Sequence, residues 1–115
     1  MKNNRLYFEH MLEAIKLVER YARGFNYNQF TKDTEKQDAI VRRLQIIGEA
    51  SNRVPQEIKT RLPNVPWKQM LGMRNIIVHD YMYVDLQKVW SVIEDDLPKL
   101  KQIIQAALKK LGSGS

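Results

Sequence analysis

The sequence predicts an all-α fold, an antiparallel bundle of four main helices in one domain. Apolar residues recur at helical spacing in each long segment, and no window of five or more residues alternates with the period of a strand. Short connections between the helices favour antiparallel neighbours. A chain of 115 residues can also bury about two-thirds of the surface that its unfolded form exposes, so its core needs no disulfides.

The first two main helices are predicted from apolar stripes. The first stripe is Phe8, Met11, Ile15, Val18 and Ala22, and Gly24 is the predicted end of that helix. Residues 26–33 are expected to form a connector or a short helical turn. The second helix is predicted to open on a capping box between Thr34 and Gln37 and to end at Pro55. Its stripe is Ile40, Leu44, Ile47, Ala50 and Val54.

Two glycines lie inside predicted helices, where glycine costs about 1 kcal/mol relative to alanine. They are Gly48 and Gly72, and both are expected to allow the close approach of a neighbouring helix.

The second half of the chain is predicted to contain the other two main helices. Residues 55–63 form a turn or a one-turn helix, and Pro66 is the predicted first residue of a helix that runs to about His79. Residues 80–84 are its frayed end and a turn. The last helix starts at Asp85, with a kink or break expected at Pro98. Its predicted stripe is Val89, Ile93, Leu97, Leu100, Ile104, Ala107 and Leu111.

Composition and charge narrow the function classes. The domain is expected to cover residues 1–111, and the Gly/Ser run 112–115 is interpreted as a flexible linker outside it. The formal net charge of +6 favours a polyanionic partner such as nucleic acid. No window of 18 uninterrupted apolar residues and no signal-peptide pattern occur, so no membrane association and a cytoplasmic location are expected.

Several kinds of chemistry are excluded by the residues present. Without cysteine the chain has no disulfide framework, cysteine nucleophile or thiolate zinc site. It has neither a P-loop nor a G-x-S-x-G elbow. The two histidines, His10 and His79, lack carboxylates at ligand spacing, so neither a metal nor a cofactor is expected. The acidic run 94–96 is interpreted as a solvated face, because consecutive helical residues point about 100° apart.

The most informative segment is residues 74–81, which combines a guanidinium, an amide, an imidazole and a phenol at Arg74, Asn75, His79 and Tyr81. Imidazole has an unperturbed pKa of about 6.5 and can take or give a proton near neutral pH. Guanidinium can clamp phosphate oxygens. These groups suit RNA cleavage without a metal. Because Arg74 and His79 lie about 140° apart around an ideal helix, local unwinding or a second copy of the chain must bring them to one phosphate.

Other residues with similar chemistry have structural interpretations. Arg5 and His10 repeat the Arg-x4-His spacing, but they lie beside core residues of the first helix, and Glu9 would oppose an anion there. His10 is therefore interpreted as a structural or surface histidine. The aromatic and sulfur side chains of Trp67, Met70 and Met73 are expected in the core or a dimer contact rather than as platforms for base stacking.

An ordered set of segments resembles the HepT-like branch of the HEPN (higher eukaryote and prokaryote nucleotide-binding) superfamily. The segments are residues 38–50, 65–67, 72–81, 89–90 and 96–98, and they include an Arg-x4-His-x-Tyr motif at Arg74, His79 and Tyr81. The resemblance implies a dimeric helical bundle with two motifs facing one cleft. It also implies that the chain is a metal-independent endoribonuclease toxin whose activity depends on Arg74 and His79, with Asn75 as an assisting polar residue.

The same resemblance implies a partner and a regulatory site. Tyr81 matches the tyrosine that an MntA-like nucleotidyltransferase antitoxin modifies with AMP, and the dimer could assemble further with that antitoxin. A second interpretation stays open, because fold alone does not determine activity. In it, the chain is a non-catalytic HEPN dimer that binds nucleotide, RNA or a partner protein.

Overall fold

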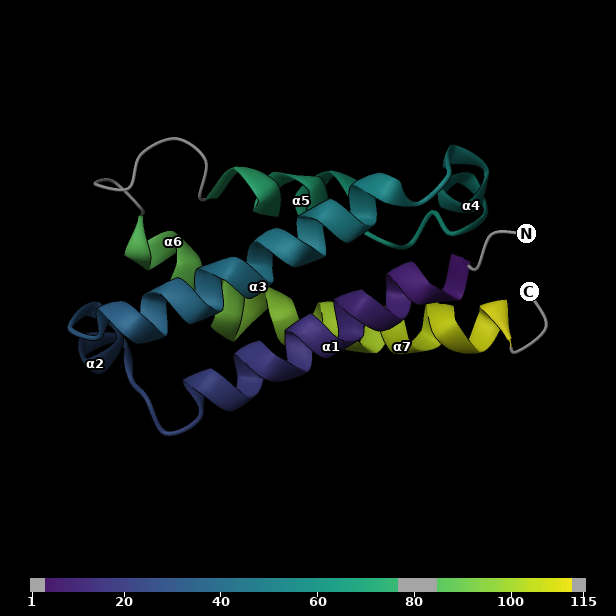
Figure 1. The fold of residues 1–115 in the computed structure, drawn as a ribbon. Helices are drawn as coiled ribbons and strands as arrows, with labels where there is room; N and C mark the ends of the chain where they lie inside the picture. The colour runs from purple at the N-terminus through teal and green to yellow at the C-terminus, as the bar shows by residue number, and fades with distance from the viewer. Residues whose placement is uncertain (1–3, 77–84, 113–115) are drawn as a thin grey trace.

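The computed structural model describes residues 4–76 and 85–112, and this part of the chain is helical without a β-strand. Its three longest helical stretches are α1 (Asn4–Ala22), α3 (Thr34–Arg53) and a continuous stretch formed by α6 (Leu86–Ser91), the π-helical turn η2 (Val92–Asp96) and α7 (Leu97–Leu111). Figure 1 shows α1 lying along both α3 and α7, with the start of α1 and the end of α7 on the same side of the molecule. The all-α prediction is confirmed for the described residues.

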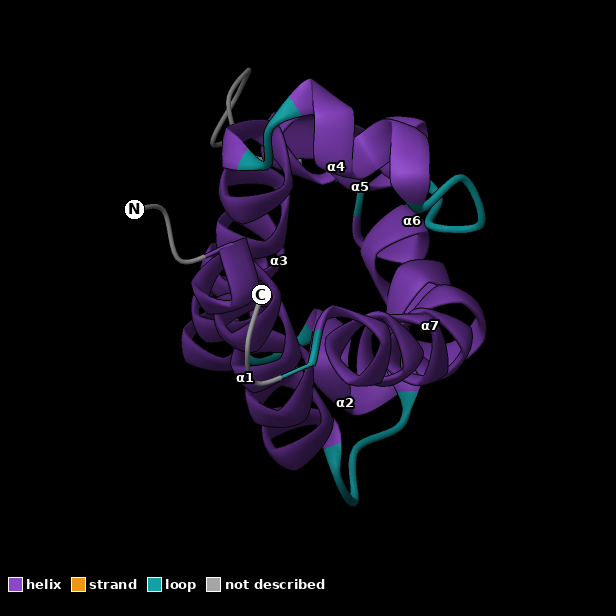
Figure 2. Cartoon of the chain, turned by 90° about the vertical axis from the view of Figure 1, so that its right-hand side faces the viewer, coloured by secondary structure: helices purple, strands orange, loops and turns teal. Residues whose placement is uncertain are grey.

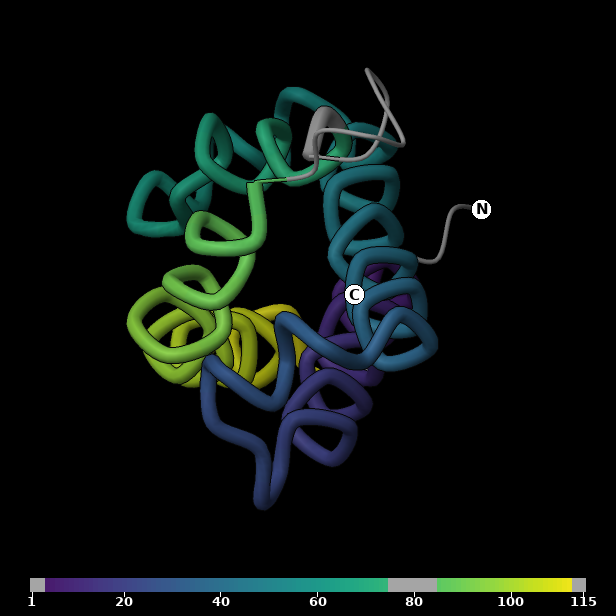
Figure 3. The backbone as a smooth tube through the Cα atoms, turned by 90° about the vertical axis from the view of Figure 1, so that its left-hand side faces the viewer, coloured from purple at the N-terminus to yellow at the C-terminus, as the bar shows by residue number. Residues whose placement is uncertain are grey.

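Short helices complete the bundle. They are α2 (Tyr27–Thr31), α4 (Gln56–Arg61) and α5 (Trp67–Gly72), and α5 continues into the 3₁₀ turn η1 (Met73–Ile76). The two end views show α4 and α5 on the side of the bundle between α3 and α6 (Figures 2 and 3). Side chains fill the interior, and the largest that are fully buried include Phe8, Phe30, Met11, Ile15, Leu44, Ile47, Met70, Leu97 and Ile104.

The first two apolar stripes lie in the core as predicted. Phe8, Met11, Ile15 and Val18 of α1 are buried, while Ala22 is half-buried; every residue of the second stripe, from Ile40 to Val54, is buried. The chain leaves α1 through Gly24, whose φ of 82° is in the left-handed region that favours glycine. The predicted end of the first helix is confirmed.

The predicted capping box at Thr34 is wrong. Asp33 is the N-cap of α3, and its Oδ1 accepts a hydrogen bond of 2.9 Å from the backbone N–H of Lys36. The Gln37 side chain donates instead to the carbonyl of Phe30, at 2.9 Å. Aspartate and threonine are both favoured at N-caps, and here the helix takes its cap from the residue before the predicted one.

A capping box does form at α2, inside the segment expected to be a connector or short turn. The Asn26 side chain accepts from the N–H of Gln29 at 2.8 Å, and the Gln29 side chain accepts from the N–H of Asn26 at 2.9 Å. The two bonds satisfy two donors that the first turn leaves free, which explains why this five-residue helix forms.

The kink or break expected at Pro98 takes the form of the π-helical turn η2 just before it, and the helical stretch continues through this turn without a break. The N–H of Leu97 donates to the carbonyl of Val92, five residues earlier. Pro98 then lies in the first turn of α7, where its missing N–H is not needed. Because a π turn shifts the register of the helix, Val92 is buried and the predicted Ile93 is only half-buried.

The third predicted helix is shorter in the described part than expected. Pro66 lies at the N-cap of α5, one residue before the helix, and α-helical structure ends at Gly72. The expected continuation over residues 77–79 and the turn at 80–84 lie outside the described residues. The count of four main helices therefore stays a prediction. No described helix is both long enough and apolar enough to span a membrane.

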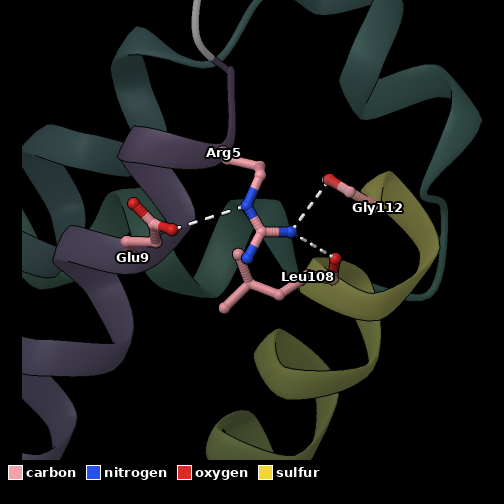
Figure 4. Close-up of polar contacts among 4 residues, drawn as sticks. All are labelled: Arg5, Glu9, Leu108 and Gly112. Atoms are coloured by element: carbon pink, nitrogen blue, oxygen red, sulfur yellow. Dashed lines mark hydrogen bonds and ion pairs between the residues drawn. The ribbon is translucent and has the colours of Figure 1, made fainter. Parts of the chain in front are cut away.

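Two polar contacts join α1 to α7. Nη1 of Arg5 donates to the carbonyls of Leu108 at 2.9 Å and Gly112 at 3.0 Å, and its Nε lies 3.4 Å from the Glu9 carboxylate (Figure 4). The guanidinium thereby satisfies carbonyls that the last turn of a helix leaves free. Lys101 forms the second contact, an ion pair of 2.8 Å with Glu19.

Candidate active site

Arg74 lies on η1, a turn that buried side chains hold against the core. Met70 and Met73 are 0% and 2% exposed. Trp67, at the start of α5, packs edge-on against the Phe8 ring at a centroid distance of 6.0 Å, and its indole N–H donates to a backbone carbonyl. Met70 and Met73 are therefore core residues, as expected, and Trp67 is half-buried and packs against the core. Arg74, the residue after Met73, is exposed.

Gly48 on α3 allows η1 to approach very closely. A Cβ placed on Gly48 would lie 2.5 Å from Cγ of Arg74, 2.6 Å from its backbone N and 3.1 Å from its Cα. The main chain of η1 therefore lies directly on α3, and the base of the Arg74 side chain is held against that helix. The close neighbour expected for Gly48 is confirmed. A Cβ at Gly72 would meet no described atom within 4 Å, so the described residues provide no close neighbour for that glycine and the expectation there stays a prediction.

Ser51 supports α3 beside this contact. Its side chain is fully buried, and its Oγ donates to the carbonyl of Gly48 at 2.9 Å. The bond gives the buried hydroxyl the partner that it requires. Ser51 was not predicted from the sequence. One sequence feature could have indicated it: Ser51 is a small polar residue three positions after Gly48, so the two lie side by side on the surface of one helix.

The structure places the predicted site residues only in part. The side chain of Arg74 is described, as is the main chain of Asn75 within η1. His79 and Tyr81 lie outside the described residues. Regular α-helix ends at Gly72, before Arg74. Residues 73–76 form a 3₁₀ turn, so the described residues after Gly72 do not keep the ideal α-helical geometry that would separate Arg74 and His79 by about 140°.

The second Arg-x4-His match has the structural role expected of it. Arg5 is engaged by the end of α7 and by Glu9, as described above (Figure 4). His10 is exposed on α1, in agreement with its interpretation as a surface histidine. An arginine held by two carbonyls and a carboxylate is poorly placed to clamp a phosphate.

Two further charged groups on helix surfaces, Arg42 and Asp95, have local partners. Arg42, exposed on α3, donates to the Gln45 side chain at 2.9 Å. In the acidic run, Glu94 and Asp95 are exposed, and Asp95 accepts a hydrogen bond of 3.2 Å from Ser91. Within residues 4–76 and 85–112, no three His, Asp or Glu side chains gather as metal ligands would.

Comparison with known proteins places the chain among ribonuclease-like sequences. Residues 11–107 match the model of a family described as "Ribonuclease HepT-like". The "Probable ribonuclease HepT" of Thermococcus cleftensis is 37% identical over 100 residues, which cover 87% of this chain and 91% of that protein. A "Putative RNase" of Caldanaerobacter subterraneus is 34% identical over 110 residues, which cover 96% of this chain and 98% of that protein.

A third relative is longer than this chain. The "Gamma-glutamylcyclotransferase and putative RNase" of Methanocaldococcus jannaschii is 37% identical over 110 residues, and this chain spans 50% of its length. No solved structure matches. The family match extends from within α1 to within α7 and includes the turn that carries Arg74. The chain belongs to the HepT-like ribonuclease family.

Proposed function

We propose that this chain is a metal-independent endoribonuclease in which Arg74 clamps the scissile phosphate, His79 moves the protons and Asn75 assists. Membership of a ribonuclease family supports this function. The observation that carries it is the arrangement at η1: the Arg74 main chain is fixed between Met73 and Gly48, while its side chain is exposed. A cation presented from a fixed backbone is suited to stabilise charge that develops in a transition state.

The proposed reaction uses the 2′-hydroxyl of the RNA itself. That hydroxyl loses its proton to a base, its oxygen bonds to the adjacent phosphorus, and the 5′-oxygen leaves with a proton. The products are a 2′,3′-cyclic phosphate and a 5′-hydroxyl. Negative charge grows on the non-bridging oxygens, where the two parallel N–H donors of Arg74 would bind. An imidazole such as that of His79 can serve as the base or the acid near neutral pH.

The role of His79 is tested with His10 as the matched control. We expect His79→Ala to lower the single-turnover rate of RNA cleavage by about 10²-fold or more. His10 is exposed on α1, and His10→Ala should cleave like the wild type. If His79→Ala cleaves at the wild-type rate, or if it does not fold, the proposed role is wrong. A protein that binds RNA without cleaving it would instead be the non-catalytic module.

The proposed site is completed by a second copy of the chain. In a twofold dimer each motif faces its twin across one cleft, so the residues of two chains converge on one RNA. The family resemblance supports this arrangement. Light scattering at micromolar concentration should report a dimer, and a monomer that cleaves RNA at full rate would contradict the composite site.

Regulation is proposed to act at Tyr81. A partner nucleotidyltransferase of the MntA type would deprotonate the phenol, whose oxygen attacks the α-phosphate of ATP and releases pyrophosphate. The added AMP places a phosphate anion on Tyr81, which is close to Arg74 in the sequence. That anion can compete with RNA phosphate for the Arg74 guanidinium. The chain would thus be the toxin of a toxin–antitoxin pair that acts on RNA in the cytoplasm, and the dimer could assemble further with the antitoxin.

The modification is tested by intact mass and ribonuclease activity after incubation with the neighbouring nucleotidyltransferase, Mg²⁺ and ATP. We expect a mass increment of one or more AMP groups together with loss of cleavage. Tyr81→Phe should be neither modified nor inhibited. Equal modification of Tyr81→Phe, or full activity of the modified protein, would show that Tyr81 is not the regulatory site.

A further inference from the structure

We infer that Gly48 is a positioning residue of the proposed ribonuclease site: by having no side chain, it sets where the Arg74 guanidinium stands. The inference rests on the proposed function, because it takes Arg74 as the phosphate clamp. It goes further by assigning part of that clamp to a residue on a different helix. Gly48 lies 26 positions before Arg74 in the sequence and contacts it through the backbone and the first part of the side chain.

The contact cannot be relieved by a side-chain rotation alone. Of the three Arg74 atoms closest to a Cβ at Gly48, the backbone N at 2.6 Å and the Cα at 3.1 Å belong to the main chain. Ordinary contacts of a Cβ begin at 3.4 Å. A methyl group on Gly48 would therefore displace the Arg74 main chain by about 1 Å, which is the scale at which misplacement of a catalytic group matters.

The displacement would fall on η1 rather than on α3. On α3, Leu44 and Ile47 are fully buried, and Ser51 is both buried and bonded to the carbonyl of Gly48. That helix has 20 residues, whereas η1 has four. The short turn is the softer of the two elements, so the added methyl would move Arg74 relative to the rest of the site.

The expected consequence is a loss in the chemical step. Displacement of a catalytic group by about 1 Å can lower a rate by about 10²-fold. RNA binding draws on many phosphate contacts, and Gly48 itself is buried in the protein. Gly48→Ala should therefore lower kcat by about 10²-fold with little change in KM.

The control is Gly72→Ala, two residues from Arg74 on the same segment. Gly72 is exposed, and a Cβ there meets no described atom within 4 Å. Alanine is the better helix former at both positions, so a general effect of removing a helical glycine would appear in both variants. We expect wild-type kcat and KM for Gly72→Ala.

The decisive experiment is a double-mutant cycle on the full chain, measured by single-turnover cleavage of an oligoribonucleotide and by thermal unfolding. In the protein that keeps Arg74, Gly48→Ala should strongly lower the cleavage rate. In the Arg74→Ala protein, adding Gly48→Ala should not lower the residual cleavage rate any further. Wild-type kcat in Gly48→Ala, or an equal further loss in Arg74→Ala, would overturn the inference. If Arg74→Ala itself cleaves normally, it is the proposed function that fails.

The inference also stays testable if Gly48→Ala does not fold. In that case Gly48→Ala is combined with Arg74→Ala, which removes the closest of the three clashing atoms, the Cγ at 2.5 Å, but leaves the main-chain N at 2.6 Å. If the remaining clash is relieved by the shift of η1 inferred above, the double variant should recover a cooperative unfolding transition. A double variant that also fails to fold would show that Gly48 serves the packing of α3 against α5 as a whole and not the placement of Arg74. That result would overturn the inference.

Discussion

Replacing Arg74 with alanine should remove RNA cleavage and leave the fold nearly as stable as before. Arg74 is exposed, and no hydrogen bond or ion pair joins its guanidinium to another described residue. The substitution removes the packing of its Cγ against Gly48. Burial of one methylene contributes about 0.8 kcal/mol. Since 1 kcal/mol corresponds to roughly 4 °C in a domain of this size, the Tm should fall by about 3 °C or less.

The effect on catalysis should be far larger. Loss of one preorganised donor to a developing oxyanion lowers kcat by about 10²–10³-fold, and Arg74→Lys should fail as well because a point charge does not reproduce a planar two-donor clamp. The assay is single-turnover cleavage of labelled RNA, with the Tm measured on the same samples. Arg42→Ala is the matched control, because Arg42 is an exposed arginine on α3 bonded to Gln45. Wild-type cleavage by Arg74→Ala, or a loss of cleavage that follows unfolding, would show that Arg74 is not the phosphate clamp.

Two further predictions concern stability. Arg5→Ala removes two charge-assisted hydrogen bonds, to the carbonyls of Leu108 and Gly112. The Arg5 side chain is 29% exposed, so solvent weakens these bonds. The free energy of unfolding, measured by urea denaturation, should therefore fall by about 1–2 kcal/mol. Glu9→Ala removes only the exposed ion pair with Arg5 and should change the free energy of unfolding by less than about 0.5 kcal/mol. Equal losses of stability in Arg5→Ala and Glu9→Ala would contradict the capping of α7 by Arg5. Met70 is fully buried, so Met70→Ala should cost about 2–5 kcal/mol, and a cost below about 1 kcal/mol would show that α5 is not anchored as described.

The sequence predicted those parts of the fold that depend on local periodicity. The stripe from Ile40 to Val54 was predicted in full because each member follows from the 3.6-residue repeat. The cap of α3 was missed because Asp33 and Thr34 are both good N-caps, and only the path of the chain decides between them. The burial of Val92 in place of Ile93 was missed because it depends on a hydrogen bond to a carbonyl five residues back.

For the candidate site, the sequence predicted residue types but not their setting. A glycine inside a helix indicates a close neighbour but does not say which residue it is. For Gly48 that neighbour is Arg74, whereas Gly72 has no close neighbour among the described residues. No spacing rule connects α3 with a turn 26 residues later in the sequence. This contact depends on how α5 packs on the core, through Met70 and Met73. The roles of His79 and Tyr81 stay predictions.

This chain is proposed to cleave RNA by attack of the 2′-hydroxyl without a metal. The most direct test is to incubate the purified wild-type protein with an oligoribonucleotide in excess EDTA and to analyse the product ends by mass spectrometry. We expect cleavage at an undiminished rate, products ending in 2′,3′-cyclic phosphate, and no cleavage of the same sequence with a 2′-deoxy nucleotide at the scissile position. Activity abolished by EDTA and restored by a divalent cation, or products ending in 3′-hydroxyl, would contradict this mechanism.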